Sequence, residues 1–232
     1  LGPYQHLLRK ERRDSTNGCR NTNNQVSRIG LPPHYFSRED ESPDENFYQD
    51  PRFTTHIDDA TISEITKYYR ETLLPSDRLL DLMSSWISHL PNEVGFRQVS
   101  GLGMNRKEMD LNPRLNDSIV QNLNTTPSLP YADHSYDVVM IAVSIQYLTK
   151  PYEVFSEIAR VLAPGGRCIV VMSHRVFPTK TIYAFLNLAP AERCELVSNY
   201  MEETGQIIEI DILDRSPRHA DPLWLVVGRK TK

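Results

Sequence analysis

Residues Leu129 to Ser173 read LPYADHSYDVVMIAVSIQYLTKPYEVFSEIARVLAPGGRCIVVMS, and this stretch decides the fold. Apolar residues run from Val138 to Val143, and a second apolar run extends from Cys168 to Met172. Between them, apolar side chains recur at the spacing of one helix face, from a start at Pro151 to a stop at Pro164-Gly165-Gly166. A strand, a helix and a second strand in this order predict a parallel crossover, whose sheet is buried on both faces.

Two phrases in this stretch resemble a known family. LPY-x-D-x-SYDVV and the helix end EIARVLAPGG are similar to the LPF-x-(D/N)-x-SFD and R-V-L-x-P-G-G phrases of class I S-adenosylmethionine-dependent methyltransferases of the type 11 kind. The resemblance implies an α/β protein with the Rossmann-like, seven-stranded methyltransferase fold, a mostly parallel sheet with helices on both faces. It also implies S-adenosyl-L-methionine as the cofactor, and we expect a small-molecule acceptor as the substrate.

The composition excludes several classes of protein. A chain of 232 residues with 39% hydrophobic residues can bury one α/β core, and no stretch approaches the roughly 20 apolar residues of a membrane span. A net charge of -4 argues against a general nucleic-acid binder. We therefore expect a soluble, intracellular protein of the cytoplasm or an organelle stroma, with no membrane and no nucleic acid among its partners. The oligomeric state stays open.

The three cysteines, Cys19, Cys168 and Cys194, form neither a paired framework nor a metal-ligand spacing. Cys168 falls in a predicted buried strand, which favours a core thiol and a reducing compartment. No metal is expected, because helix capping explains the two acidic residues after His56 better than metal ligation does. The chain does not begin with Met, so we expect a processed or truncated chain, in which a removed targeting peptide would leave no trace.

The chain divides at about residue 45. Residues 1–45 form a polar N-terminal extension, in which basic residues come first and acidic residues follow. A solvated extension that drapes over the domain or stays mobile explains this composition better than a basic arm for an acidic partner. Residues 46–232 form the methyltransferase-like domain, and packed structure is expected to begin near Phe47.

Apolar runs and turn residues predict the elements of this domain. Strands are expected at 79–83, 99–104, 118–121, 138–143, 168–172, 207–213 and 223–227. Helices are expected from Asp58 or Asp59 to Pro75, from Asn105 to Pro113, over 151–163, over 179–188 and over 190–204. The order predicts helices between the first five strands and a closing hairpin, as in the family's fold.

The glycine-rich cofactor loop of the family is missing. The resemblance implies L-D-x-G-x-G-x-G after the first strand, and here Met83, Ser85 and Ile87 hold the glycine positions. The loop can take another path, with hydroxyls and backbone N–H groups of Ser84 and Ser85 serving the cofactor carboxylate. Alternatively, the pocket accepts a different ligand, or it is empty.

The neighbouring phrases S-S-W-x-S-H and P-R-F-x-x-H-I-D-D, at residues 84–89 and 51–59, resemble a little-characterised type 11-like subset from plants and algae. This resemblance implies that the glycine-free loop is a feature of the subset.

The resemblance places the other cofactor residues at the ends of strands two to four. Gly103 stands where the family has an acidic residue for the ribose hydroxyls, and Asn105 is the substitute acceptor. Met104 would pack on the adenine, Asn122 would accept from its amino group, and the Leu123 N–H would donate to its ring. The predicted cofactor-binding residues are Asp81, Ser84, Ser85, Trp86, Met104, Asn105, Asn122, Leu123 and Ser144.

The acceptor site is expected at the carboxyl ends of the strands, where open α/β sheets bind ligands. The predicted acceptor-binding residues are Tyr48, His56, Gln146, Tyr147 and Arg175. His174 is the predicted catalytic residue, a general base chosen from its position after the fifth strand. Methyl transfer mostly needs an enzyme that binds and aligns the cofactor and the acceptor and excludes water. The absence of a nucleophile signature in this sequence is therefore compatible with enzyme function. The alternative is a non-catalytic methyltransferase-like binding or scaffold protein with a degenerate cofactor site.

Overall fold

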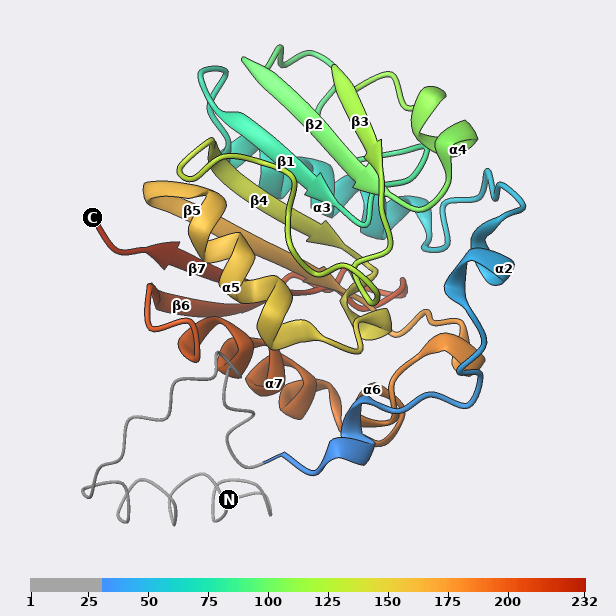
Figure 1. Cartoon of the computed structure of the whole chain (residues 1–232). Helices are drawn as coiled ribbons and strands as arrows, with labels where there is room; N and C mark the ends of the chain where they lie inside the picture. The colour runs from blue at the N-terminus through green and yellow to red at the C-terminus, as the bar shows by residue number, and fades with distance from the viewer. Residues whose placement is uncertain (1–30) are drawn as a thin grey trace, which may run out of the picture.

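Strands of one sheet lie in the order β3-β2-β1-β4-β5-β7-β6 (Figure 1). The computed structural model describes residues 31–232, so residues 1–30 of the predicted extension, with Cys19, lie outside the described range. The strands are β1 (Arg78–Leu82), β2 (Gln98–Gly103), β3 (Asp117–Val120), β4 (Tyr136–Ala142), β5 (Leu162–Met172), β6 (Ile207–Asp214) and β7 (Trp224–Lys230). Strands β1 to β5 are parallel, and β7 is antiparallel to both β5 and β6. The predicted fold class is confirmed.

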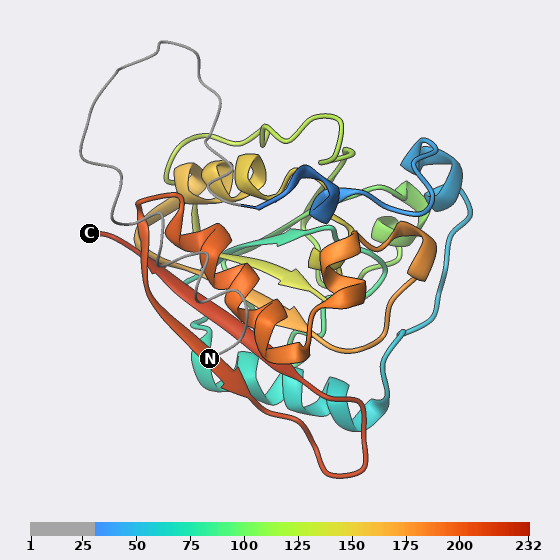
Figure 2. The same ribbon diagram turned by 90° about the horizontal axis from the view of Figure 1, so that it is seen from below.

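Helices cover both faces of the sheet, with α3 on one face and α5 and α7 on the other (Figures 1 and 2). The α-helices are α2 (Asp44–Tyr48), α3 (Asp59–Thr72), α4 (Arg106–Asp110), α5 (Pro151–Val161), α6 (Tyr183–Asn187) and α7 (Pro190–Glu202). Three short 3-10 helices are η1 (Pro33–Phe36), η2 (Ile145–Tyr147) and η3 (Pro178–Lys180). Within residues 31–232, no helix combines the length and the apolar character that crossing a membrane requires.

The central strands are apolar along their whole length because each face of the sheet is covered. In β4, Val138 and Met140 pack in the cluster that contains α3, whereas Val139 and Ile141 pack in the cluster that contains α5 and α7. All four side chains are fully buried. The continuous apolar run of the sequence is therefore the period-2 pattern of a strand with two buried faces. Cys168 lies in the same core, and burial raises the pKa of its thiol.

Two helix expectations are wrong. The connections 83–97 and 121–135, both within the described range, contain no helix, although the expected order has helices between the first five strands; the stretch from Asn122 to Pro130 is itself expected as a loop. Prolines interrupt both segments, at Pro91 and at Pro127 and Pro130, and remove backbone donors that a helix needs. The helix expected over 179–188 is divided into η3 and α6, because the backbone between them is extended at Thr181.

Packed structure also begins earlier than the predicted start near Phe47. Phe36 of η1 is buried, and its ring lies 6.0 Å from that of Tyr152 and 6.5 Å from that of Tyr200. These rings belong to α5 and α7, so η1 closes the core cluster of that face. Two adjacent aromatic residues, Tyr35 and Phe36, in an otherwise polar segment carry no periodic signal, which explains why the sequence pattern missed this contact.

Candidate active site

A cavity of about 430 Å³ lies at the carboxyl ends of the parallel strands. Its wall is formed by the ends of β1, β2 and β4, the loops after β1, β3 and β5, and the N-terminal segment 44–56. The volume falls within the roughly 300–1,000 Å³ of small-molecule sites. All the predicted cofactor-binding residues line it: Asp81, Ser84, Ser85, Trp86, Met104, Asn105, Asn122, Leu123 and Ser144. Tyr48, His56, Tyr147 and Arg175 of the predicted acceptor site line it too.

Two predicted site residues lie outside the cavity wall. Gln146 is buried behind it, where its side-chain amide donates to the Val143 carbonyl at 3.0 Å. The His174 side chain is half exposed, and its Nε2 lies 3.4 Å from Oδ1 of Asp221 in the loop before β7. His174 therefore does not line the cavity, and its role as a general base stays a prediction. The neighbouring Ser173 hydroxyl donates to the Pro222 carbonyl at 2.7 Å, so this end of β5 is joined to the loop before β7.

The loop after β1 keeps a glycine-like backbone without glycine. Met83, at the first glycine position, has a φ of 58°, in the left-handed region that favours glycine. The Ser84 N–H then donates to the Leu102 carbonyl at 2.9 Å, which brings the loop across the end of β2. The loop therefore follows its own path, and residues of that path line an open cavity rather than fill it.

Buried polar contacts hold this loop in place. Asp81 accepts hydrogen bonds from the hydroxyls of Ser84 at 2.8 Å and Ser88 at 2.6 Å. The side-chain amide of Asn112 donates to the Ser88 hydroxyl and to the Ser85 carbonyl, both at 2.9 Å. Burial nevertheless raises the pKa of Asp81 to about 6, because the two hydroxyls offset only part of the desolvation cost. A buried polar network thus fixes the path of the loop after β1.

Two cavity residues carry buried polar atoms with no hydrogen-bond partner among the described residues, Nδ1 of His89 and Oγ of Ser144. Burial lowers the pKa of His89 to about 4, so its imidazole is neutral near pH 7. An unpaired buried polar atom costs free energy, which a ligand hydrogen bond can recover. Sequence reasoning named His89 only as the end of the S-S-W-x-S-H phrase and did not include it among the predicted site residues.

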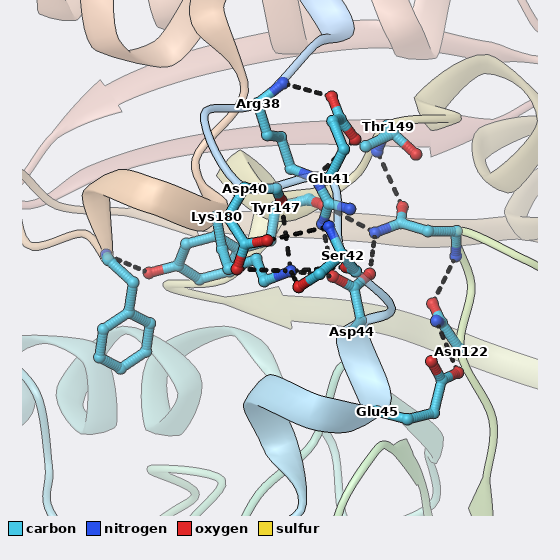
Figure 3. Close-up of polar contacts among 12 residues, drawn as sticks. Arg38, Asp40, Glu41, Ser42, Asp44, Glu45, Asn122, Tyr147, Thr149 and Lys180 are labelled. Carbon is cyan, nitrogen blue, oxygen red and sulfur yellow. Dashed lines mark hydrogen bonds and ion pairs between the residues drawn. The ribbon is translucent and has the colours of Figure 1, made fainter.

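The side chains of Asn105 and Asn122 are already engaged by protein groups. Oδ1 of Asn105 caps α4 by accepting from the Glu108 N–H at 3.2 Å, and its Nδ2 donates to the Tyr48 carbonyl at 2.9 Å. Nδ2 of Asn122 donates to Glu45 at 2.9 Å (Figure 3). Helix α2 therefore uses the two amides that the resemblance assigned to ribose and adenine.

A cluster of charged side chains, all buried except Asp40, fastens α2 beside the cavity; we call it the strap cluster, and it comprises Arg38, Asp40, Asp44 and Lys180 (Figure 3). Asp44 is 2.6 Å from Nη1 of Arg38 and 3.4 Å from Nζ of Lys180. Lys180 is fully buried, and its Nζ also lies 3.1 Å from Asp40. The cluster joins the N-terminal segment to η3, so residues far apart in the chain close one side of the cavity.

Aromatic rings surround the other end of the cavity. The ring of Phe177 lies 5.8 Å from Tyr147, 5.4 Å from Phe47 and 5.2 Å from His56. The guanidinium of Arg52 packs 4.4 Å from the Phe47 ring centre and 5.4 Å from that of Phe177. Sequence reasoning did not assign Arg52 or Phe177 to the site, although Arg52 stands within the P-R-F phrase that it had singled out.

Part of this chain is similar to known methyltransferase sequences. Residues 87–170 match the model of the type 11 methyltransferase domain family. A demethylmenaquinone methyltransferase of Renibacterium salmoninarum is 38% identical over 58 residues, which are 24% of this chain and 24% of that protein. The methyltransferase GfsG of Streptomyces halstedii is 27% identical over 142 residues, 55% of this chain and 51% of that protein. The matches span about half or less of the length of these relatives.

Solved structures share the fold. The SAM-dependent methyltransferase of Thermotoga maritima, a possible histamine N-methyltransferase, superposes with a TM-score of 0.54 and 14% identity over 72% of this chain and 89% of its own. The cyclase SpnF superposes with a TM-score of 0.54 and 18% identity over 72% of this chain and 80% of its own. The fold is thus the class I methyltransferase fold, and its presence in a protein called a cyclase shows that the fold alone does not determine the reaction.

Proposed function

We propose that this protein is an S-adenosylmethionine-dependent methyltransferase that acts on a small-molecule acceptor. The observation that carries the proposal is the open cavity at the strand ends, into whose wall all the predicted cofactor residues converge. The match of residues 87–170 to the methyltransferase domain family supports it. We include in the proposal that the glycine-free loop is a feature of a type 11-like subset from plants and algae; the left-handed backbone of Met83, at a φ of 58°, is consistent with an ordered loop without glycine.

The cavity wall fits the chemistry of this cofactor. Apolar side chains at the β2 and β3 ends, Leu102, Met104 and Leu123, suit an adenine ring, whereas the hydroxyls and N–H groups near Ser84 and Ser144 suit its amino-acid part. When bound, the cofactor supplies an electrophilic methyl group on a sulfonium centre. The protein then needs to align the acceptor and exclude water. Trp86 helps to exclude water, because its Nε1 donates to the Thr54 carbonyl at 3.1 Å and ties the loop to the N-terminal segment.

The acceptor is proposed to lie at the aromatic end, against Tyr147 and Phe177. In place of His174, the imidazole of His56 is available there to receive a proton from the acceptor. Burial lowers the pKa of His56, which keeps its imidazole neutral and able to accept that proton near pH 7. A relative named for demethylmenaquinone supports a small organic molecule as the acceptor.

Titration calorimetry with S-adenosylmethionine and S-adenosylhomocysteine tests the proposed function. We expect both to bind and both to raise the unfolding temperature. His174→Ala is the matched control, and it should bind both ligands like the parent protein because His174 lies outside the cavity. No heat and no thermal protection at millimolar ligand would overturn the proposal.

A second candidate function is a non-catalytic methyltransferase-like binding protein. It is favoured by one observation, that α2 engages the side chains of both Asn105 and Asn122. Asn122→Asp would normally strengthen an adenine contact, but here it places a carboxylate beside Glu45. The double variant Asn122→Asp with Glu45→Gln avoids this repulsion and should bind S-adenosylhomocysteine more tightly if adenine lies there. Unchanged affinity of the double variant supports the second candidate.

A further inference from the structure

We propose that Glu108, on the first turn of α4, supplies the carboxylate that holds the ribose hydroxyls of the cofactor. The inference rests on the proposed function and assigns a residue that the sequence pattern did not select. It replaces the earlier expectation that Asn105 accepts the ribose hydroxyls, because both polar atoms of that side chain are used within the protein.

The end of β2 has no room for an acidic side chain. A Cβ built at Gly103 would lie closer than 3.0 Å to the Ser84 carbonyl oxygen and 3.1 Å from Sδ of Met109. The obstacle is backbone, held by the hydrogen bond from the Ser84 N–H to the Leu102 carbonyl, so it cannot rotate aside. A carboxylate that serves this part of the cavity therefore has to come from another element.

Glu108 reaches the same part of the cavity from α4. Its Oε2 accepts from the Ser85 hydroxyl at 2.5 Å, and its Oε1 accepts from the Arg52 N–H at 2.7 Å. One contact comes from the loop after β1 and the other from the N-terminal segment, so the carboxylate is held at the junction of both. A carboxylate has about four lone-pair sites, and two remain for a ligand.

Glu108 is also the acidic residue of the cavity wall whose charge is not otherwise neutralised. The other two acids of the wall are Asp44 and Asp81. Asp44 is paired with Arg38 and Lys180. Asp81 is fully buried, uses Oδ2 for two serine hydroxyls, and has its pKa raised to about 6 by burial. Within the described residues Glu108 has no cationic side chain within ion-pair distance. It therefore keeps both its charge and its free lone pairs for neutral hydroxyl donors.

Binding measurements with modified ligands test the assignment. The probes are S-adenosylhomocysteine and its 2′-deoxy and 3′-deoxy analogues, titrated into the parent protein and into Glu108→Gln. We expect the parent protein to bind each deoxy analogue about tenfold or more weakly, as hydrogen bonds to a charged acceptor predict. Glu108→Gln should bind S-adenosylhomocysteine weakly, but it should no longer distinguish that ligand from the deoxy analogues.

Two further variants keep the test decisive. Asp110→Asn removes an exposed acid of the same helix, and its affinities should match those of the parent protein. Glu108→Asp keeps the charge and shortens the reach, so it should show intermediate discrimination even if Glu108→Gln fails to fold. An equal loss for all three ligands would identify Glu108 as a loop support only and overturn the assignment. If the parent protein binds none of the ligands, the proposed function itself fails.

Discussion

The backbone carbonyl oxygen of Ser84 lies against the α-carbon of Gly103, where the loop after β1 crosses the end of β2. The family pattern has glycines in that loop and an acidic residue on β2, whereas this chain has Met83 in the loop and glycine on β2. Two backbones that cross this closely leave space for a side chain on only one of them. Relative to the family pattern, the glycine has moved from the loop after β1 to the end of β2, and the larger side chain has moved from β2 to the loop.

This contact predicts the cost of a methyl group on β2. Gly103→Ala should lower the free energy of unfolding by about 2–3 kcal/mol, because the Ser84 backbone must move to admit a Cβ. Urea denaturation measures the change, and Gly95→Ala is the control because a Cβ there meets nothing within 4 Å. Gly103→Asp should be at least as destabilising and should not improve cofactor binding. Equal denaturation midpoints for Gly103→Ala and the parent protein would contradict the crossing of the two backbones.

The left-handed backbone of Met83 predicts that glycine is more stable than alanine at this position, the reverse of the usual order. Met83→Ala and Met83→Gly both remove the side chain, but only glycine relieves the strain at a φ of 58°. Met83→Gly should therefore be more stable than Met83→Ala by about 1 kcal/mol. Met104, whose φ is not in this region, is the control, and there alanine should be more stable than glycine. Thermal unfolding of the four variants measures these differences. If alanine is more stable than glycine at both sites, the backbone at Met83 is not strained.

Burial of Asp81 predicts a pH-dependent gain in stability on Asp81→Asn. The pKa of Asp81 is raised from 3.8 to about 6, so the folded state binds its proton more tightly than the unfolded state. Its stabilising contribution is complete below pH 3.8 and is lost as pH rises through 6. Above pH 7, Asp81→Asn should therefore be more stable than the parent protein, by up to about 3 kcal/mol.

Denaturation across pH 4–8 measures this gain, with Asp110→Asn, which changes an exposed acid outside the loop, as the control. The gain should vanish near pH 4, where the parent carboxyl is protonated. If Asp81→Asn is less stable than the parent protein at every pH, the hydrogen bonds from the two serines stabilise the ionised carboxylate by more than burial destabilises it.

The strap cluster predicts how the N-terminal segment is held. Lys180→Met leaves Asp44 buried beside Arg38 alone, and it removes the Nζ donor of the Ser42 carbonyl at 2.7 Å. Breaking such a buried pair should cost about 3–5 kcal/mol. Amide hydrogen exchange should increase first over residues 38–48. Asp40→Asn changes a more exposed member of the cluster and should have a smaller effect. Unchanged exchange in Lys180→Met would show that aromatic packing alone holds the segment.

Sequence reasoning predicted the elements whose signals are local. The apolar run in β4, the Pro151 start of α5 and the capping of α3 by Asp58 each depend on residues within a few positions of one another. The same reasoning did not predict the connection after β1 or the position of His174 outside the cavity wall. The path of that connection depends on Asp81, Ser88 and Asn112, which are brought together by folding.

The sequence by itself determined the parallel crossover, the sheet buried on both faces and the set of residues at the strand ends, because strand and helix periodicity place side chains on known faces. Only the tertiary structure decided how the cavity is closed and which carboxylate remains free in it. Lys180 and Asp40 lie 140 residues apart, and Glu108 meets the Arg52 N–H across 56 residues. Such contacts depend on where separate segments of the backbone cross, and no local pattern in the chain records that position.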